Sequence, residues 1–395
     1  MLRFRIILLT VTLLLCAPIF GQGRLVSVQR EQILSLEQQI DSVVLEFGLD
    51  VQKKDLAYAF RILKLIKREV HCVALTYRTI DPKGREVIAS GLISYPEHGR
   101  WRGTVEMSPY NREKPLCGSS RLYTTEVLAS VLGYVTLIPD NIGYGATDSL
   151  AIAYQISGNS ALVSAHLREA AKEYFRDHLD RKLPRNTFLF GYSLGAPNAL
   201  ALAYHYADHP ESDIRLKAVC LGSGAYNPTL AFEQILSRGE VSYLFYPGLV
   251  RSLNSWLDTG LDPSQLFCGR VLEDYETISE GMKSPLDLAR EYGTDIHTYL
   301  HPNFFNGQES LDIIGLKEAL KFLSIPPESV RPLPASVEVV LRHSAEDNIV
   351  PVACTDALYQ QLKAPWHSVI YHRNKKGTHY ETAVRSFIDL ALLLL

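Results

Sequence analysis

A five-residue segment near the middle of the chain limits the possible folds more than any other feature. Gly191-Tyr192-Ser193-Leu194-Gly195 follows the apolar run Thr187–Phe190 and precedes the helix-like run Ala196–Tyr206. Gly-x-Ser-x-Gly between a strand and a helix is typical of a sharp turn that projects the serine hydroxyl from the carboxyl edge of a sheet. The two glycines have no side chain to clash within so tight a turn. The segment therefore predicts Ser193 as a candidate nucleophile with a strained backbone.

A serine hydroxyl becomes a good nucleophile when a base takes its proton and an acid orients that base. With this kind of turn, the acid and then a histidine are expected after later strands. Asp347 follows the apolar run Val337–Leu341, and His379 follows the run Ser368–Tyr371. The sequence therefore predicts a catalytic set of Ser193, Asp347 and His379.

Two neighbours of the predicted acid leave alternatives open. Glu346 is a rival acid, because it stands next to Asp347. Adjacent residues point in different directions, so only one of the two can reach the imidazole. His343 stands at the end of the preceding strand, where a structural role is common, but it is also close enough in sequence to contact the acid.

Short apolar runs alternate with amphipathic helical patterns along most of the chain. Two β-rich runs, Val70–Ile80 and Arg85–Tyr95, come first. Further strand candidates are Val105–Met107, Tyr134–Ile138, Thr187–Phe190, Leu216–Leu221, Val337–Leu341 and Ser368–Tyr371. Strand and helix alternation of this kind predicts an α/β fold, with a mostly parallel sheet flanked by helices.

One long segment interrupts this alternation. Residues 227–334 contain no convincing buried strand, but capping residues before prolines at 262–263 and 284–285 indicate helix starts. We therefore expect residues 227–334 to form a helical cap or lid inserted between the nucleophile and the acid. The core would then consist of a first part, residues 70–226, and a second part, residues 335–395.

The N-terminal segment has the build of a secretory signal peptide. Two arginines precede a mostly apolar run over residues 6–20, and Gly21 is a small residue suited to a cleavage point. We expect cleavage of residues 1–21 and a secreted or periplasmic product, with an uncleaved anchor as the alternative. Residues 22–69 are predicted to form a helical lead-in, because their pattern is charged and helical.

The composition excludes several classes of protein. The 395 residues carry 40 Lys and Arg against 43 Asp and Glu, so no basic surface for nucleic acid is indicated. Cleavage would leave an odd number of cysteines, which allow one disulfide and lack metal-like spacing. They are Cys72, Cys117, Cys220, Cys268 and Cys354. We expect no nucleic-acid partner, no metal and no organic cofactor.

Acyl transfer at a serine also needs hydrogen-bond donors for the oxyanion of the tetrahedral intermediate. The backbone N–H of Leu194, directly after the serine, is the first candidate. The second donor is expected from the loop Ser108–Asn111, which follows a predicted strand. Pro109 has no N–H, so Tyr110 or Asn111 is the candidate, and Tyr110 is our first choice.

These motifs together resemble those of α/β-hydrolases, and more narrowly those of the secretory lipase family with a large helical cap. The nucleophile turn, the 154 residues from Ser193 to Asp347 and the 32 residues from Asp347 to His379 carry the resemblance. Ile138–Gly145 is similar to that family's segment after the fourth strand, and Ser90–Pro96 to its strand leading towards the oxyanion loop. The resemblance covers about residues 70–395. The His-Gly turn that relatives often carry after the third strand is absent.

The resemblance implies a secreted serine hydrolase that cleaves carboxylic esters through an acyl-enzyme, with a small-molecule or lipid ester as substrate. The aromatic residues of the cap suit an apolar acyl chain, or simply the packing of cap on core. The alternatives are a serine exopeptidase of prolyl or dipeptidyl type and an inactive binding protein on the same fold. An opening cap could touch a lipid surface transiently, although no basic amphipathic helix marks such a site.

Overall fold

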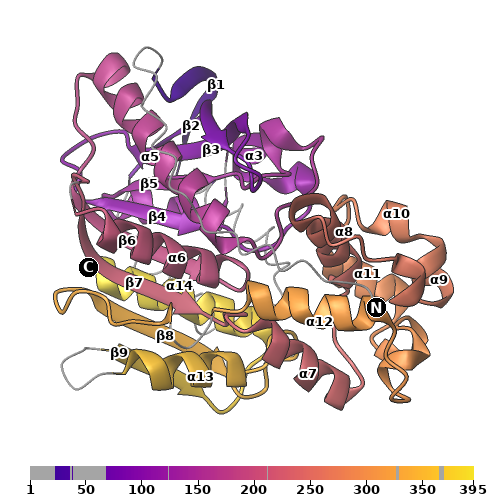
Figure 1. The fold of residues 1–395 in the computed structure, drawn as a ribbon. Helices are drawn as coiled ribbons and strands as arrows, with labels where there is room; N and C mark the ends of the chain where they lie inside the picture. The colour runs from indigo at the N-terminus through magenta and orange to yellow at the C-terminus, as the bar shows by residue number, and fades with distance from the viewer. Residues whose placement is uncertain are drawn as a thin grey trace.

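One nine-stranded sheet runs through the molecule (Figure 1). The computed structural model describes residues 23–35, 38, 68–122, 124–210, 212–325, 329–363 and 369–395. The strand order is β1-β2-β3-β5-β4-β6-β7-β8-β9. The strands are β1 (Leu25–Leu34), β2 (Val70–Ile80), β3 (Glu86–Pro96), β4 (Thr104–Ser108), β5 (Val135–Pro139), β6 (Asn186–Tyr192), β7 (Arg215–Gly222), β8 (Glu338–Ser344) and β9 (Val369–Asn374).

The ladders between these strands are mostly parallel. β4 is parallel to both β5 and β6, and the parallel pairing continues through β7 and β8 to β9. Antiparallel ladders join β1 to β2, β2 to β3 and β3 to β5. The predicted α/β fold with a mostly parallel sheet is confirmed, and each predicted strand has an observed counterpart.

Strand β1 corrects part of the predicted helical lead-in over residues 22–69. Residues 25–34 pair with β2 as an edge strand, and most of their side chains are exposed or half-buried. The polar residues that suggested a solvated helix instead face water at the edge of the sheet, where Glu31 lies 3.2 Å from His71. Residues 39–67 and the predicted signal peptide lie outside the described residues.

Helices cover the sheet and fill the segment between β7 and β8. The α-helices are α3 (Gly118–Arg121), α4 (Leu128–Val131), α5 (Ser157–Leu179), α6 (Gly195–Asp208), α7 (Pro228–Arg238), α8 (Tyr246–Leu257), α9 (Gly269–Glu273), α10 (Tyr275–Ile278), α11 (Pro285–Tyr292), α12 (Leu311–Leu323), α13 (Ala353–Leu362) and α14 (His379–Leu394). The short 3-10 helices are η1 (Lys114–Leu116), η2 (Thr125–Val127), η3 (Gly145–Thr147), η4 (Pro263–Gln265), η5 (Ile296–Thr298) and η6 (Pro302–Phe304).

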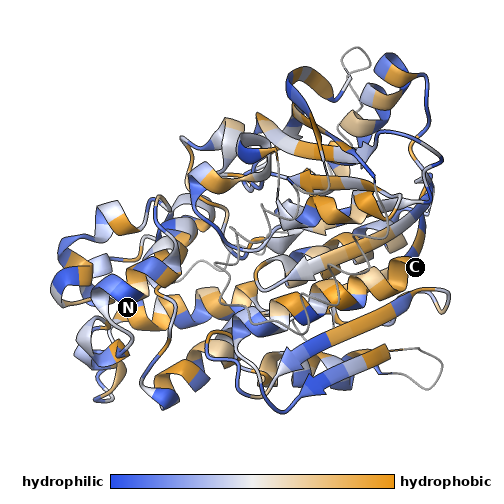
Figure 2. Ribbon diagram, turned by 180° about the vertical axis from the view of Figure 1, so that it is seen from behind, coloured by the Kyte–Doolittle hydropathy of each residue, from blue (hydrophilic) through white to orange (hydrophobic). Residues whose placement is uncertain are grey.

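Successive side chains of the central strands belong to two different hydrophobic cores. Leu189 of β6 packs in a cluster with residues of α6 and α13. The next residue, Phe190, packs in a cluster with residues of α14 on the other face. Because side chains alternate along a strand, a sheet covered on both faces needs apolar residues at nearly every central position. Figure 2 shows this hydrophobic colouring along the central strands.

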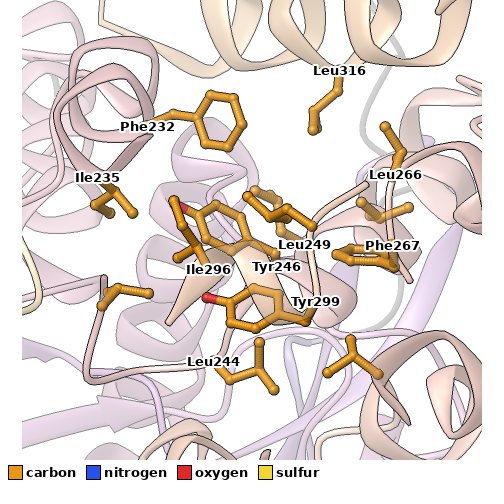
Figure 3. Packing of buried hydrophobic residues seen from close by; sticks show 14 of the residues in the cluster. Phe232, Ile235, Leu244, Tyr246, Leu249, Leu266, Phe267, Ile296, Tyr299 and Leu316 are labelled. Atoms are coloured by element: carbon orange, nitrogen blue, oxygen red, sulfur yellow. The ribbon is translucent and has the colours of Figure 1, made fainter. Parts of the chain in front are cut away.

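The segment between β7 and β8 forms a helical group with a hydrophobic cluster of its own. It contains α7 to α12, which Figure 1 shows beside the sheet, and its described residues form only isolated bridges in place of strands. Tyr246 and Tyr299 lie at the centre of the cluster, with Phe232 of α7 and Leu316 of α12 around them (Figure 3). Its aromatic residues are therefore largely used in internal packing.

A buried ionic network ties β4 to helices α5 and α6. Glu106 of β4 is 2% exposed and accepts hydrogen bonds from Arg168 of α5 and from the hydroxyl of Tyr206 of α6. Arg168 is 1% exposed and also donates to the carbonyl of Pro184 at 3.2 Å. Each buried charge depends on the other, because neither side chain has access to water.

We expect Arg168→Met to lower the free energy of unfolding by about 3–5 kcal/mol, because it leaves the Glu106 carboxylate buried without its partner. Arg176→Met on the same helix is the matched control, since the Arg176–Asp177 ion pair is 68% and 50% exposed. The control should change stability by less than about 0.5 kcal/mol. Chemical denaturation measures both variants, and equal effects would contradict the role given to the buried pair.

Candidate active site

The turn that carries Ser193 joins β6 to α6 and has a strained backbone. Ser193 has φ +55°, in the left-handed region that non-glycine residues rarely adopt. Its N–H donates to the carbonyl of Gly222 at 2.9 Å, which ties the turn to the end of β7. The strained serine predicted from the sequence is therefore present, and the neighbouring strand fixes its position.

The two glycines of the turn lie where a side chain does not fit. A Cβ atom on Gly191 would stand 2.2 Å from the carbonyl oxygen of Gly195. One on Gly195 would stand 2.0 Å from the carbonyl oxygen of Ser108, at the end of β4. The turn therefore packs directly against the loop after β4, where the sequence predicts an oxyanion donor.

His379 links Ser193 to the acid side of the site. Its Nε2 lies 3.0 Å from the Ser193 Oγ, and its Nδ1 lies 2.8 Å from the Asp347 Oδ2. His379 is the first residue of α14, and Thr378 and Glu381 form a reciprocal capping box at this helix end. The hydroxyl of Tyr192 also donates to the His379 carbonyl. These contacts hold the imidazole between its two partners.

Asp347 is the acid that reaches the imidazole. Its side chain is buried, and its Oδ1 accepts hydrogen bonds from the backbone N–H groups of Ile349 at 3.0 Å and Val350 at 2.9 Å. Glu346, the rival acid, is exposed. Burial alone would raise the pKa of Asp347, but the adjacent His379 and His343 hold it well below its ordinary value. The carboxylate is therefore ionised.

His343 lies on the far side of the same carboxylate. It is completely buried at the end of β8, and its Nε2 stands 3.3 Å from the Asp347 Oδ2. The same Nε2 is 2.9 Å from the carbonyl oxygen of Val350, and the Nδ1 is 2.7 Å from the Thr355 hydroxyl. The structure thus brings His343 into contact with the acid.

The predicted oxyanion residues flank Ser193. Leu194 directly follows it, and Tyr110 lines the same cavity as Ser193 and His379. Tyr144, within the family-like segment singled out in the sequence, fixes the loop that carries Tyr110. Its one hydroxyl hydrogen is shared between two acceptors, the Asn111 Oδ1 at 3.0 Å and the Arg112 carbonyl oxygen at 3.2 Å.

This loop also takes part in a buried ion pair that no sequence motif predicts. Arg112 forms an ion pair with Glu126 at 2.5 Å, and both side chains are almost fully buried. The guanidinium also lies over the ring of Tyr110, 4.3 Å from its centroid. The separation of Arg112 and Glu126 in the sequence is not typical of any motif, so the pair is recognised only in the folded structure.

A cavity of about 650 Å³ opens over the Ser193 hydroxyl. Core loops form one wall, and Tyr243 and helix α11 of the inserted segment form the other. The charged lining residues are Arg112, Glu113, Arg121, Asp287 and Arg290. Burial raises the pKa of Tyr380, beside His379, to about 12, so its hydroxyl stays protonated at neutral pH.

The remaining predicted features concern metals, disulfides and membranes. Among the described residues no group of three or more His, Cys, Asp or Glu side chains is arranged to hold a metal ion. The five cysteines retained after the predicted cleavage are all free thiols. Burial raises the pKa of Cys72 and of Cys354 to about 12, so these thiols stay protonated. No described helix has the length and apolar character that crossing a membrane requires.

Comparison of sequences finds no relative of this chain, since no family model and no curated protein matches it. Solved structures do match along most of its length. A candidate hydrolase from Legionella pneumophila is 18% identical, with a TM-score of 0.75 and coverage of 94% of this chain and 97% of that one.

Two further similar structures are an esterase and a lipase. LipA, the rice cell wall degrading esterase of Xanthomonas oryzae, is 17% identical, with a TM-score of 0.67 and coverage of 93% of this chain and 96% of that one. Candida antarctica lipase A is 13% identical, with a TM-score of 0.58 and coverage of 91% and 78%. At such identities the likeness concerns the fold, and it confirms the predicted α/β-hydrolase fold.

We expect Gly195→Ala to lower the free energy of unfolding by about 1–3 kcal/mol, because the new methyl group must displace the carbonyl of Ser108. Gly158→Ala, near the start of α5, is the matched control, since a Cβ atom there has nothing within 4 Å. The control should be neutral or slightly stabilising. Denaturant unfolding compares the two, and equal stabilities would contradict the close approach of turn and loop.

Proposed function

We propose that this chain, which has the α/β-hydrolase fold, is a serine hydrolase that cleaves carboxylic esters with Ser193, His379 and Asp347 as its catalytic residues. The observation that carries the proposal is the continuous hydrogen-bonded series from Asp347 through His379 to Ser193, with distances of 2.8 and 3.0 Å. It lies at a cavity large enough for a small organic ester.

The geometry suits general-base catalysis by the imidazole. An ionised Asp347 accepts the Nδ1–H of His379, which leaves the Nε2 lone pair free to accept the Ser193 proton. The serine oxygen then attacks the ester carbonyl, and the alcohol leaves with the proton that the imidazole returns. Water activated by His379 releases the acid from the acyl-enzyme.

Backbone amides are proposed to bind the oxyanion. The Leu194 N–H lies at the start of α6, where unpaired N–H groups and the helix dipole favour negative charge. The N–H of Tyr110 is the proposed second donor, supported by the fixed loop beside the nucleophile turn. The contacts of Tyr144 with that loop support its being rigid before substrate binds.

The cavity lining favours esters of moderate size with polar groups. Most of the aromatic side chains between β7 and β8 pack against one another and do not line the cavity. The wall from that segment carries Leu286 together with Asp287 and Arg290 of α11. We therefore propose small-molecule esters with a short acyl chain as preferred substrates. We further propose that the protein acts outside the cytoplasm, with residues 1–21 as its signal peptide.

Ser193→Ala is expected to lower kcat on p-nitrophenyl acetate by at least about a thousandfold, the usual scale for removing such a nucleophile. It should also abolish covalent labelling by a fluorophosphonate probe. Ser164→Ala is the matched control, since Ser164 is buried and its hydroxyl donates only to the Ser160 carbonyl within its own helix. Unchanged turnover in Ser193→Ala, or an unlabelled wild type, would overturn the proposal.

A substrate panel should separate the ester proposal from the exopeptidase alternative. We expect kcat/KM to be highest for acetyl to hexanoyl esters and to fall for long acyl chains, because charged side chains of the lining stand where a long apolar chain would lie. Dipeptidyl amides, including those with proline, should be turned over far more slowly. A higher kcat/KM for the amides would favour the exopeptidase, and a rising series up to long chains would favour a lipase.

A further inference from the structure

The Asp347 carboxylate is held at both oxygens, but by different kinds of donor. Backbone N–H groups of its own loop bind Oδ1, at 3.0 and 2.9 Å. Oδ2 faces His379 at 2.8 Å and His343 at 3.3 Å. Because Oδ1 is bound by N–H groups of its own loop, the position of that loop decides where Oδ2 meets His379.

The contacts of His343 determine which of its nitrogens carries hydrogen. A carbonyl oxygen can only accept, so the Nε2 that lies 2.9 Å from the Val350 carbonyl must be the N–H. The Thr355 hydroxyl can then donate to the Nδ1 at 2.7 Å, so both nitrogens have a partner. The one Nε2–H is directed at the Val350 carbonyl, so His343 acts on Asp347 through the loop whose Val350 N–H binds the Asp347 Oδ1.

His343 also closes a ring of contacts around the acid loop. Its Nε2 lies between the Asp347 Oδ2 and the Val350 carbonyl, and the Val350 N–H returns to the Asp347 Oδ1. Thr355, on α13, fixes the ring from the opposite side. The imidazole therefore joins β8, the acid loop and a helix that does not line the substrate cavity.

We propose that His343 is a positioning residue that holds the acid loop through the Val350 carbonyl, and with it the Asp347 carboxylate at the place from which it hydrogen-bonds His379. The inference rests on the proposed function of Ser193, His379 and Asp347, and it adds a fourth side chain that does not touch the substrate. Its contribution is to turnover and not to substrate binding, because it acts on the orientation of the general base.

Two variants of nearly equal size test this role. In His343→Gln the side-chain amide can place an N–H near the former Nε2, whereas in His343→Asn the amide reaches only the position of the Nδ1. We expect His343→Asn to lower kcat about ten- to a hundredfold, the scale of leaving a buried carbonyl without its donor, with KM changed less than about twofold. His343→Gln should retain at least about tenfold more kcat than His343→Asn.

The matched control is His166→Asn on α5. The His166 Nδ1 lies 2.9 Å from the Thr79 hydroxyl, much as the His343 Nδ1 lies 2.7 Å from the Thr355 hydroxyl, and neither histidine is among the residues lining the substrate cavity. The kcat and KM of this control should stay within about twofold of wild type. Equal kcat in His343→Asn and His343→Gln, or a loss seen in KM instead of kcat, would overturn the proposal.

A spectroscopic measurement keeps the test independent of activity. The downfield proton resonance of the His379 Nδ1–H reports its bond to Asp347 directly, and it should be shifted or broadened in His343→Asn and retained in His343→Gln. If the wild type cleaves no ester, the proposed function fails, and this resonance alone decides the positioning role. If His343→Asn does not fold, Thr355→Val replaces it, and an unchanged resonance there overturns the proposal.

Discussion

Backbone hydrogen bonds that continue the parallel ladder past the ends of the strands hold the candidate site together. They run from the N–H of Ser193 to the carbonyl of Gly222 (2.9 Å), from Ser223 to Arg342 (2.8 Å), and from Ala345 to Asn374 (2.9 Å). Each bond ties the loop after one strand to the end of the next strand. The loops after β6, β7 and β8 are therefore tied to the ends of β7, β8 and β9, and side chains far apart in the sequence meet at hydrogen-bonding distance.

This rigidity sustains two features that are unfavourable in isolation. A non-glycine residue at φ +55° costs on the order of 1–3 kcal/mol, and a carboxylate as buried as Asp347 needs donors on all sides. Both persist because the surrounding structure leaves no alternative conformation. Ser193 is fixed by the ladder, and Asp347 is fixed by its own loop and by two imidazoles. Strain and buried charge thus coincide at the residues proposed to act on substrate.

The sequence was most informative where a residue follows a strand. The positions of Ser193, Asp347 and His379 could be predicted because apolar runs mark the strands, and parallel strands end at one edge of the sheet. The sequence alone could not exclude the rival acid Glu346, since which of the two carboxylates reaches the imidazole depends on which side chain the loop buries. Strand β1 was missed because an edge strand with polar side chains has the composition of a solvated helix. The Arg112–Glu126 ion pair could not be predicted from the sequence, because only the tertiary fold brings these residues together.

The segment between β7 and β8 shapes the cavity, whereas the residues proposed to carry out the chemistry lie outside this segment. Its interior is filled mainly by its own side chains, which are joined by Tyr154 and by Leu194, directly after Ser193. It contributes to the cavity chiefly through Tyr243 and the α11 residues Leu286, Asp287 and Arg290. A substitution on α11 would alter which ester fits and leave the hydrogen bonds of the three candidate residues in place. The acid and base lie after this insertion in the chain, but the strand ladder fixes their positions, so the insertion can change in length or sequence without displacing them.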